Sequence, residues 1–200
     1  MPELVSWPIT PLILTALIAY LLGSISFGLI SARLFGLGNL REVGSGNTGA
    51  TNVLRTGSKA AALVTLLGDA GKGAVAVLAA RALIGEDAAQ LAGLFAFIGH
   101  CYPWLGRVKG GKGVATFLGV LLAVSLPLGA LACLIWLATA AVMRISSLSA
   151  LVAAVATPLA AFWLRPDAVV LSAVLAAIVL WRHRENIARL LKGQEPRIGS

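Results

Sequence analysis

The sequence has little charge and few residues that bind metals or form disulfides. Charged residues make up 12% of the 200 positions, about half the fraction found in an ordinary soluble domain. There are only two cysteines, Cys101 and Cys133, and only two histidines. Both cysteines lie at or within apolar stretches, and neither has the spacing of a metal ligand. The sequence therefore predicts neither a disulfide framework nor a zinc site, and we expect no metal and no other cofactor.

Apolar residues dominate what remains. They form 58% of the chain, and the mean hydropathy is +0.91. Runs of 15–25 apolar residues recur to the end of the sequence, so they predict spanning helices and not one signal peptide. We expect an all-α, polytopic integral membrane protein with a single domain over residues 1–200. The seven predicted spans are Pro11–Leu34, Lys59–Leu83, Ala88–Leu105, Val114–Leu126, Leu128–Met143, Leu148–Leu164 and Ala168–Trp181. The fourth and seventh are short, which is compatible with a locally thinned bilayer.

The charges are distributed unevenly between the two sides of these spans. One side carries Arg33, Arg41, Arg55, Lys59, Arg107, Lys109, Lys112, Arg144, Arg182, Arg184, Arg189, Lys192 and Arg197. The other side has only Arg81 and Arg165, together with Glu3, Glu86, Asp87 and Asp167. By the positive-inside rule the N-terminus is outside and the C-terminus is cytoplasmic. The net charge of +8 then forms a one-sided layer that attracts anionic lipids and substrates. No soluble basic module is present, so we expect no nucleic acid partner.

The first unusual motif, Gly44–Arg55, lies between the first two spans and reads G-S-G-N-T-G-A-T-N-V-L-R. Its glycines allow backbone N–H groups to converge on an anion, and Thr51 and Asn52 suit the start of a helix that also favours phosphate. Ser45 either binds a phosphate oxygen or caps the following turn. The residues expected to contact substrate here are Gly44, Ser45, Gly46, Asn47, Gly49, Thr51, Asn52 and Arg55. A phosphate site at a membrane surface indicates a lipid-type substrate.

The second motif, Gly99–Thr116, falls on the same side. Gly106–Lys112 has the G-x-x-x-x-G-K spacing of a P-loop, but the next residue is Gly113, not the Ser or Thr that holds magnesium. A spanning helix also precedes it where a strand is required, which argues against an NTPase. What remains is a lysine flanked by glycine amides, and we expect Gly110, Gly111, Lys112 and Gly113 to bind phosphate. Lys109 taken alone equally fits contact with lipid headgroups, and we expect His100 to bond a free carbonyl where a helix ends.

The third motif lies in the tail, Trp181–Gly193. If the seventh helix continues through it, His183 and Asn186 share one face, whereas Glu185 and Arg189 can pair. Lys192 and Gly193 mark a helix end. An amphipathic interfacial helix with snorkelling arginines explains most of the tail, but not His183 with Asn186. Within the second span, Asp69 and Lys72 have the spacing of a buried salt bridge, and a role beneath the active site is the alternative.

Together the three motifs resemble those of the bacterial membrane acyltransferases that use acyl phosphate to acylate glycerol 3-phosphate. The resemblance covers almost the whole chain, and the family's three motifs appear here as Gly44–Arg55, Gly99–Thr116 and Arg182–Glu195. It implies a seven-helix enzyme of the bacterial inner membrane whose active site faces the cytoplasm, and which makes lysophosphatidic acid and phosphate. Ser45, Arg55, Lys112, His183 and Asn186 match functional positions of the family, and Ser147 matches a further one.

Two substrates that each carry a phosphate require several cations in one place. Acyl phosphate is already activated, so direct attack by the glycerol hydroxyl needs no nucleophilic serine or cysteine. The H-x-x-x-x-D motif of thioester-using acyltransferases is missing. Either His183 or a substrate phosphate accepts the proton; nearby cations make an imidazole less basic, which favours the phosphate. A transporter of a phosphorylated metabolite is the competing class, but such proteins place polar groups at the midplane and show repeats.

Overall fold

The computed structural model describes residues 9–106 and 109–199, and every regular element within these ranges is a helix. Two of the charged residues that were assigned to a side from the sequence, Glu3 and Arg107, lie outside the described residues. The α-helices are α1 (Ile9–Gly23), α2 (Phe27–Leu34), α3 (Ala50–Leu54), α4 (Lys59–Leu83), α5 (Glu86–Cys101), α6 (Val114–Val124), α7 (Leu126–Met143), α8 (Ser146–Leu164), α9 (Val169–Arg182) and α10 (Arg184–Leu191). Three short 3-10 helices, Leu40–Glu42, Pro103–Gly106 and Pro166–Ala168, lie in connecting segments.

The ends of the predicted spans agree with helix ends to within a few residues, with one clear difference. The first predicted span is broken, because α1 ends at Gly23 and Ser26 caps a new helix by accepting a hydrogen bond from the Leu29 amide at 3.4 Å. The connection between α6 and α7 is a single residue, Ser125, which ends one helix and caps the next. Pro127 lies in the first turn of α7, where its missing N–H costs nothing.

Not every helix is long enough to cross a bilayer by itself. Among the described residues four segments are long and apolar enough, with α1 and α2 taken as one, and the bent pair α9 and α10 makes a fifth. Helix α5 has 16 residues and α6 has 11, whereas a hydrocarbon core of about 30 Å needs about 20 residues. The crossing of a bilayer by all seven predicted spans therefore stays a prediction.

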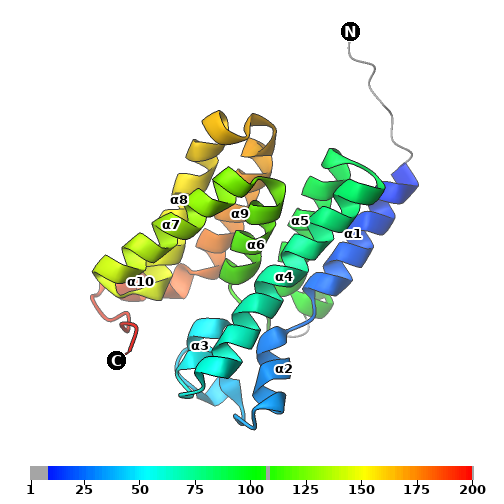
Figure 1. The fold of residues 1–200 in the computed structure, drawn as a ribbon. Coiled ribbons are helices and arrows are strands. Elements are labelled where there is room, and N and C mark those ends of the chain that lie inside the picture. The colour runs from blue at the N-terminus through cyan, green and yellow to red at the C-terminus, as the bar shows by residue number, and fades with distance from the viewer. Residues whose placement is uncertain (1–8, 107–108, 200) are drawn as a thin grey trace.

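Small residues let the helices approach closely. A Cβ placed on Gly99 of α5 would lie 2.2 Å from the Tyr20 carbonyl oxygen of α1, and one on Gly119 of α6 would lie 2.1 Å from the Ala70 carbonyl oxygen of α4. Within a membrane such close backbone contact takes the place of the hydrophobic effect in joining helices. Helix α4 runs through the middle of the molecule, with α1 and α5 beside its upper part and the layer of α6–α9 on the other side (Figure 1).

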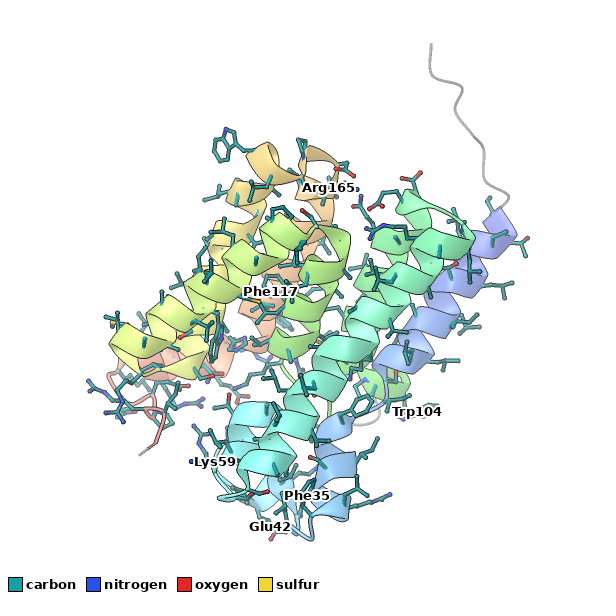
Figure 2. The ribbon with its side chains drawn as sticks, viewed as in Figure 1. Phe35, Glu42, Lys59, Trp104, Phe117 and Arg165 are labelled. Carbon is teal, nitrogen blue, oxygen red and sulfur yellow. The ribbon has the colours of Figure 1, made fainter. Side chains whose placement is uncertain are left out.

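The two predicted sides correspond to opposite ends of the helix bundle. Lys59 and Glu42 lie at one end and Arg165 at the other (Figure 2). At the second end, Arg165 bridges to Glu86 at 2.9 Å, and Arg81 bridges to the same carboxylate at 2.7 Å. Four of the charges at this end, Arg81, Glu86, Arg165 and Asp167, are therefore joined in a network, whereas the other end carries an excess of cations.

Candidate functional site

The loop of the first motif is organised by the buried side chain of Asn52. Its Oδ1 accepts hydrogen bonds from the Ser45 amide at 3.0 Å and the Ser45 hydroxyl at 3.3 Å. Its Nδ2 donates to the carbonyl oxygens of Leu40 at 3.0 Å and Asn47 at 2.7 Å. The Asn52 amide is thus engaged within the protein, where it fixes the path of the loop and the position of Ser45.

Two of the three glycines in this loop need a left-handed backbone. Gly44 and Gly46 have φ values of +49° and +65°, whereas Gly49 has an ordinary φ of −77° and precedes α3. Helix α3 is only five residues long, so it adds little dipole, and the backbone turn at Gly44 and Gly46 is the part of this loop whose geometry suits an anion. The Thr51 hydroxyl lies 3.0 Å from the hydroxyl of Ser146 on α8 and joins this loop to the fifth loop.

Arg55 and Ser45 remain accessible. Both are exposed, and the guanidinium of Arg55 makes one long hydrogen bond, 3.4 Å, to Asn52 Oδ1. The Asn47 amide donates to the backbone oxygen and the hydroxyl of Ser45, both at 3.2 Å. The Arg55 guanidinium is therefore available to a ligand at the protein surface.

The glycine loop of the second motif is clamped by Arg182, a residue that the sequence did not distinguish from its neighbours. Its guanidinium donates to the carbonyl oxygens of Gly110 at 3.0 Å and Gly111 at 2.9 Å, and lies 5.1 Å from the centre of the Tyr102 ring. Gly111 has no room for a side chain, since a Cβ would lie 2.1 Å from His100 Nε2. Gly113 has a φ of +82° where α6 begins.

Lys112 follows this clamped segment and is half-buried. Burial lowers the pKa of its ammonium to about 8, and the cations Arg189 and Arg55 act in the same direction, against the attraction of Glu195 and Glu185. A cavity of about 70 Å³ opens beside it, and its lining combines all three motifs: Asn47, Lys109, Lys112, Arg182, Arg184 and Glu185. Of the residues predicted to bind phosphate, Asn47 and Lys112 line this small polar cavity.

The third motif does not continue as one helix. Helices α9 and α10 meet at a bend of 62°, so the expectation of a continuous helical face through His183 and Asn186 is wrong. Both side chains are nevertheless buried. His183 Nδ1 lies 2.8 Å from the Val179 carbonyl oxygen, which can only accept, so Nδ1 carries the hydrogen and Nε2 has the free lone pair. Burial lowers the pKa of this imidazole to about 4.

Glu195, the last residue of the third motif, joins the tail to the rest of the site, although no role was predicted for its side chain. Its carboxylate accepts hydrogen bonds from the Ser147 hydroxyl at 2.7 Å, from the Asn186 amide, and from Arg189 Nε at 2.7 Å. The expected pairing of Arg189 with Glu185 is therefore wrong, because the tail folds back and Glu195 takes its place. Burial alone would raise the pKa of Glu195, but these hydrogen bonds hold it below its usual value.

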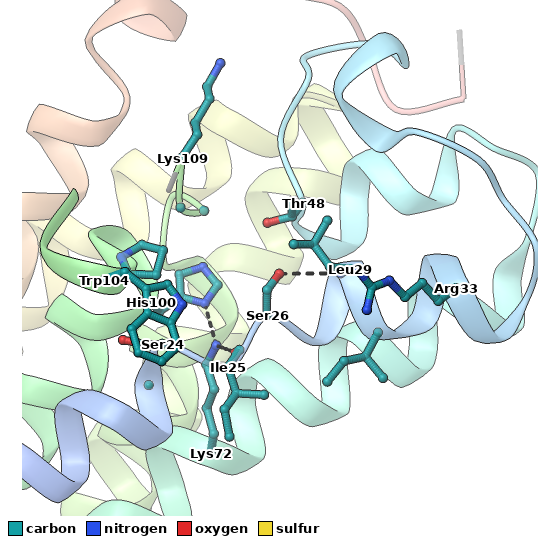
Figure 3. A pocket seen from close by; sticks show the side chains of 15 residues that line it. Ser24, Ile25, Ser26, Leu29, Arg33, Thr48, Lys72, His100, Trp104 and Lys109 are labelled. Carbon is teal, nitrogen blue, oxygen red and sulfur yellow. Dashed lines mark hydrogen bonds between the residues drawn. The ribbon is translucent and has the colours of Figure 1, made fainter. Parts of the chain in front are cut away.

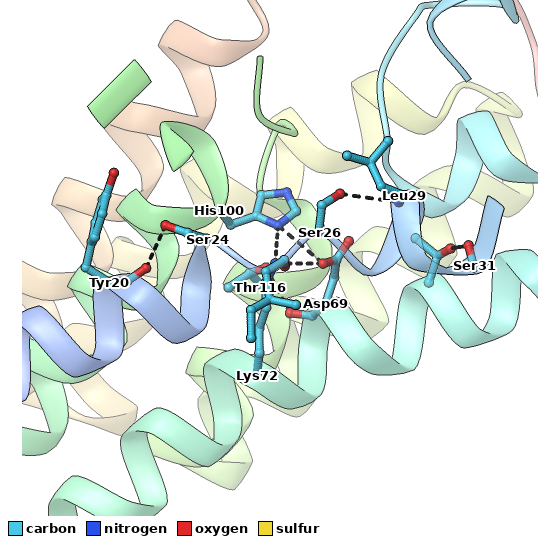
Figure 4. Close-up of polar contacts among 11 residues, drawn as sticks. Tyr20, Ser24, Ser26, Leu29, Ser31, Asp69, Lys72, His100 and Thr116 are labelled. Carbon is cyan, nitrogen blue, oxygen red and sulfur yellow. Dashed lines mark hydrogen bonds and ion pairs between the residues drawn. The ribbon is translucent and has the colours of Figure 1, made fainter. Parts of the chain in front are cut away.

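A buried ionic cluster lies beneath the glycine loop (Figure 4). Lys72 and Asp69 form the expected salt bridge at 2.7 Å. Lys72 also donates to the Ile25 carbonyl oxygen at 2.6 Å and lies 2.9 Å from His100 Nδ1. The expectation that His100 bonds a free carbonyl is wrong: its ring faces Lys72 and Asp69, because α4 and α5 pack side by side at this level.

A second, larger cavity of about 260 Å³ opens beside this cluster (Figure 3). Its lining includes Lys72, His100, Thr48, Arg33 and Lys109, and Gly110 and Gly111 also line it. Of the residues predicted from sequence, Asn47 and Lys112 line the small cavity, whereas Ser147 and Asn186 meet on Glu195. Among the described residues, those that line the two cavities do not include Ser45, Arg55 or His183.

Known proteins are similar to this chain in sequence and in fold. A sequence model of the glycerol-3-phosphate acyltransferase family matches residues 13–193. A glycerol-3-phosphate acyltransferase from Jannaschia sp. (strain CCS1) is 67% identical over 187 residues, which cover 93% of this chain and 92% of that protein. The crystal structure of PlsY (YgiH), an integral membrane glycerol 3-phosphate acyltransferase, in its glycerol 3-phosphate form has a TM-score of 0.87. It is 40% identical, and the match covers 94% of this chain and 96% of that one.

A second crystal structure of PlsY, the lysophosphatidic acid form, has a TM-score of 0.84 and 37% identity, covering 94% of this chain and 95% of that one. Both matches extend over nearly the whole length, and the family model spans residues 13–193, which contain the first two motifs and the third as far as Gly193. The resemblance seen in the motifs is confirmed, and the protein is an all-helical, multi-pass integral membrane protein. This chain belongs to the glycerol-3-phosphate acyltransferase family.

Proposed function

We propose that this protein transfers the acyl group of an acyl phosphate to the 1-hydroxyl of sn-glycerol 3-phosphate. The products are lysophosphatidic acid and inorganic phosphate, and the reaction belongs to phospholipid synthesis. The observation that carries the proposal is the small polar cavity in which Asn47 of the first motif, Lys112 of the second and Arg184 of the third meet. A dianionic phosphate fits such a cavity, and the neighbouring lipid supplies an acyl donor.

The site supplies charge and position in place of a covalent nucleophile. Lys112 and Arg55 neutralise the phosphates, and the turn at Gly44 and Gly46 adds backbone donors. The glycerol hydroxyl attacks the carbonyl carbon of the acyl phosphate, the new carbon–oxygen bond forms, and the bond to the phosphate oxygen breaks. The departing phosphate takes the bonding electrons, and positive charge around it lowers the barrier to its departure.

The proton of the attacking hydroxyl goes to a phosphate oxygen in this proposal. His183 is buried and its Nε2 is a weak base, with a pKa of about 4, so it is better suited to holding a hydroxyl or phosphate than to removing a proton. Asn186 Oδ1 is buried without a hydrogen-bond partner among the described residues. A hydroxyl of the acceptor substrate would satisfy it, with Glu195 fixing the Asn186 amide from the other side.

We further propose that all seven predicted spans cross the bacterial inner membrane, with the N-terminus outside and the C-terminus in the cytoplasm. The support is the separation of charge between the two ends, with a cationic excess at the end that carries Lys59 (Figure 2). Helix α6 has 11 residues, so its crossing requires a locally thinned bilayer. The active site then faces the cytoplasm, where glycerol 3-phosphate is present.

Acylation of labelled glycerol 3-phosphate by purified protein tests the function. We expect labelled lysophosphatidic acid from palmitoyl phosphate and none from palmitoyl-CoA, and release of one phosphate per acyl group transferred. A Lys59→Gln variant, which removes an exposed cation outside both cavities, should retain the activity. Uptake of labelled substrate into proteoliposomes without any acylation would instead identify a transporter.

A further inference from the structure

The glycine loop of the second motif, residues 109–113, has no room for side chains where it passes α5. A Cβ on Gly110 would lie 2.5 Å from the Cys101 carbonyl oxygen, and one on Gly111 would lie 2.1 Å from His100 Nε2. Close packing therefore requires glycine at both positions. Glycine also has the most conformational freedom to lose on folding, so this segment needs contacts from outside itself to keep one conformation.

Arg182, the last residue of α9, supplies such contacts. Its Nε donates to Gly111 O at 3.1 Å, and its Nη2 donates to Gly110 O at 3.0 Å and to Gly111 O at 2.9 Å. The guanidinium lies 5.1 Å from the centre of the Tyr102 ring, and the Tyr20 hydroxyl of α1 holds Tyr102 by donating to its carbonyl oxygen at 2.7 Å. In the described part of the chain no carboxylate pairs with Arg182. Its hydrogen bonds are therefore made to the loop and not to an acid.

These hydrogen bonds also set the direction of two peptide units. A trans peptide places its N–H opposite its C=O, and the described chain has no cis peptide bond. With the preceding carbonyl oxygens on Arg182, the amides of Gly111 and Lys112 point away from it. The Gly111 amide accordingly donates to His100 O at 3.2 Å, on the far side of the loop. The loop is thus held from two sides, by α9 and by α5.

The residue on the far side is itself fixed. His100 Nδ1 lies 2.9 Å from Lys72 Nζ. Lys72 in turn bridges to Asp69 at 2.7 Å and donates to the Ile25 carbonyl oxygen at 2.6 Å. The buried cluster thereby joins α4, α5 and the break between α1 and α2 (Figure 4). Against this fixed support, Arg182 is the contact through which α9 acts on the loop.

The position of Lys112 depends on this backbone. Lys112 follows Gly111 directly, so the direction of the peptide unit between them fixes where its side chain begins. The side chain is half-buried and lines the small cavity. Among the described residues its ammonium has no hydrogen bond or ion pair within the protein. The glycine loop, and not a side-chain partner, therefore determines where this charge lies.

We propose that Arg182 is a positioning residue of the reaction: by holding the carbonyl oxygens of Gly110 and Gly111 it fixes the glycine loop, and so places the Lys112 ammonium at the small cavity. The inference rests on the proposed function, because it gives Lys112 a part in the acylation. Arg182 acts on the rate through Lys112. Arginine is specific to this role, because lysine lacks the planar fork that reaches two acceptors and stacks on a ring.

Replacement of the arginine by lysine separates the effect of a clamp from that of a charge. Arg182→Lys and Arg182→Gln should each lower kcat/KM for glycerol 3-phosphate by about tenfold or more, as expected for loss of one or two hydrogen bonds. Arg41→Lys is the matched control, since Arg41 is exposed, lies outside both cavities and belongs to the same predicted side. Its kcat/KM should change by less than about twofold. Wild-type activity in Arg182→Lys would overturn the inference, because a charge alone would then suffice.

A double-mutant cycle shows whether the effect passes through Lys112. In a Lys112→Ala background, Arg182→Lys should lower kcat/KM by less than about twofold, because residues that act through one contact are not additive. An undiminished loss of about tenfold in that background would overturn the inference. It would instead indicate that Arg182 acts on the substrate directly.

The pH dependence gives a readout that a general loss of stability does not produce. In Arg182→Lys the alkaline limb of kcat/KM should move to higher pH, because a released loop exposes the Lys112 ammonium, whose burial lowers its pKa to about 8. Lysine keeps the positive charge at position 182. The variant also leaves unchanged the charged groups that act on this ammonium: Glu195, Arg189, Glu185 and Arg55. An alkaline limb that stays at its wild-type pH would contradict the release of the loop.

Hydrogen exchange tests the clamp without an activity assay. The Gly111 amide should exchange about tenfold faster in Arg182→Lys, whereas the amides of α4 and α6 should keep their wild-type rates. If Arg182→Lys does not purify as a folded protein, Tyr102→Leu replaces it, since this variant removes the stacked ring and leaves the guanidinium. Its exchange at Gly111 should rise about two- to fivefold.

The same measurement distinguishes this inference from the proposed function. Unchanged exchange at Gly111 in the variant that folds would overturn the inference, whatever the activity of the wild type. A wild type that did not acylate glycerol 3-phosphate, with the effect on exchange intact, would overturn the proposed function and leave Arg182 as the clamp of the loop.

Discussion

Lys112 illustrates how burial adjusts a charge that the proposed reaction needs. Its ammonium must be protonated to bind phosphate, and burial lowers its pKa to about 8. Activity as kcat/KM should therefore fall as the pH rises through about 8. Lys112→Arg should remove this alkaline limb, since arginine stays charged. In kcat the limb should move to higher pH, because a bound dianion raises the pKa of the ammonium. The measurement is the dependence of the acylation rate on pH, with limiting glycerol 3-phosphate for kcat/KM and saturating glycerol 3-phosphate for kcat.

Substitution of Arg55 and Lys112 by alanine tests how much each charge contributes to catalysis. Arg55→Ala and Lys112→Ala should each lower kcat/KM by about 100-fold or more, because a pre-placed charge at a developing anion contributes about 3 kcal/mol. Both variants should still insert and purify, since Arg55 is exposed and Lys112 is only half-buried. The steady-state acylation rate is the readout. Near-normal turnover would mean that these motifs bind lipid headgroups and not substrate.

The acid side of the same profile identifies the proton acceptor. A base must be deprotonated to act, so activity falls as the pH drops through its pKa. His183 as base would place this limb at about 4, whereas a phosphate monoester would place it near 6, its second pKa. We expect the limb near 6, and we expect it to persist in His183→Gln with the main loss in KM. A variant that binds both substrates normally but shows no chemistry at any pH would identify His183 as the base.

At the scale of elements, close packing of helices rests on individual glycines. Gly119→Ala would bring a Cβ to 2.1 Å from the Ala70 carbonyl oxygen, so α4 and α6 must move apart. Such overpacking costs about 1–3 kcal/mol, and the midpoint of thermal unfolding in detergent should fall. Gly71→Ala is the matched control on α4, since nothing lies within 4 Å of its Cβ. That variant should be neutral or slightly more stable, because glycine is a poor helix residue. Equal midpoints for the two variants would contradict this account of the contact.

Helix existence is predictable from the sequence because each apolar run is a local property. The second predicted span, Lys59–Leu83, coincides with α4, and the predicted helix end at Lys192 and Gly193 is confirmed by the end of α10 at Leu191. The break after Gly23 and the bend at His183 were not predicted. Both lie inside continuous apolar or amphipathic patterns, and neither is marked by a proline. Packing against other elements decides where such a helix changes direction.

At the scale of the whole molecule, the charge distribution makes a prediction about topology. Lys109 and the tail should be cytoplasmic and Glu86 should be outside. In a background with Cys101 and Cys133 replaced, Lys109→Cys should resist a membrane-impermeant thiol reagent in intact cells and react after permeabilisation. Asp87→Cys, beside Glu86, is the better outside reporter, because Asp87 is exposed whereas Glu86 pairs with Arg81 and Arg165. Labelling of Lys109→Cys in intact cells would overturn the orientation.

The amino-acid sequence alone predicts the membrane class, the approximate helices, the charged side and the three motifs that identify the family. These features depend on composition, short-range spacing and residue identity, all of which are properties of the amino-acid sequence. Asp69 and Lys72 belong with them, since their bridge spans three residues of one helix.

Contacts between residues of different motifs depend on how the helices pack in three dimensions. Arg182 reaches the glycine loop from 71 residues away, Ser147 meets Glu195 across 48 residues, and Lys72 meets His100 across 28. Spacing along the chain carries no information about such pairs, because the packing of whole helices sets the distances between them. The same packing places Gly110 and Gly111 at the larger cavity and Lys112 at the smaller one.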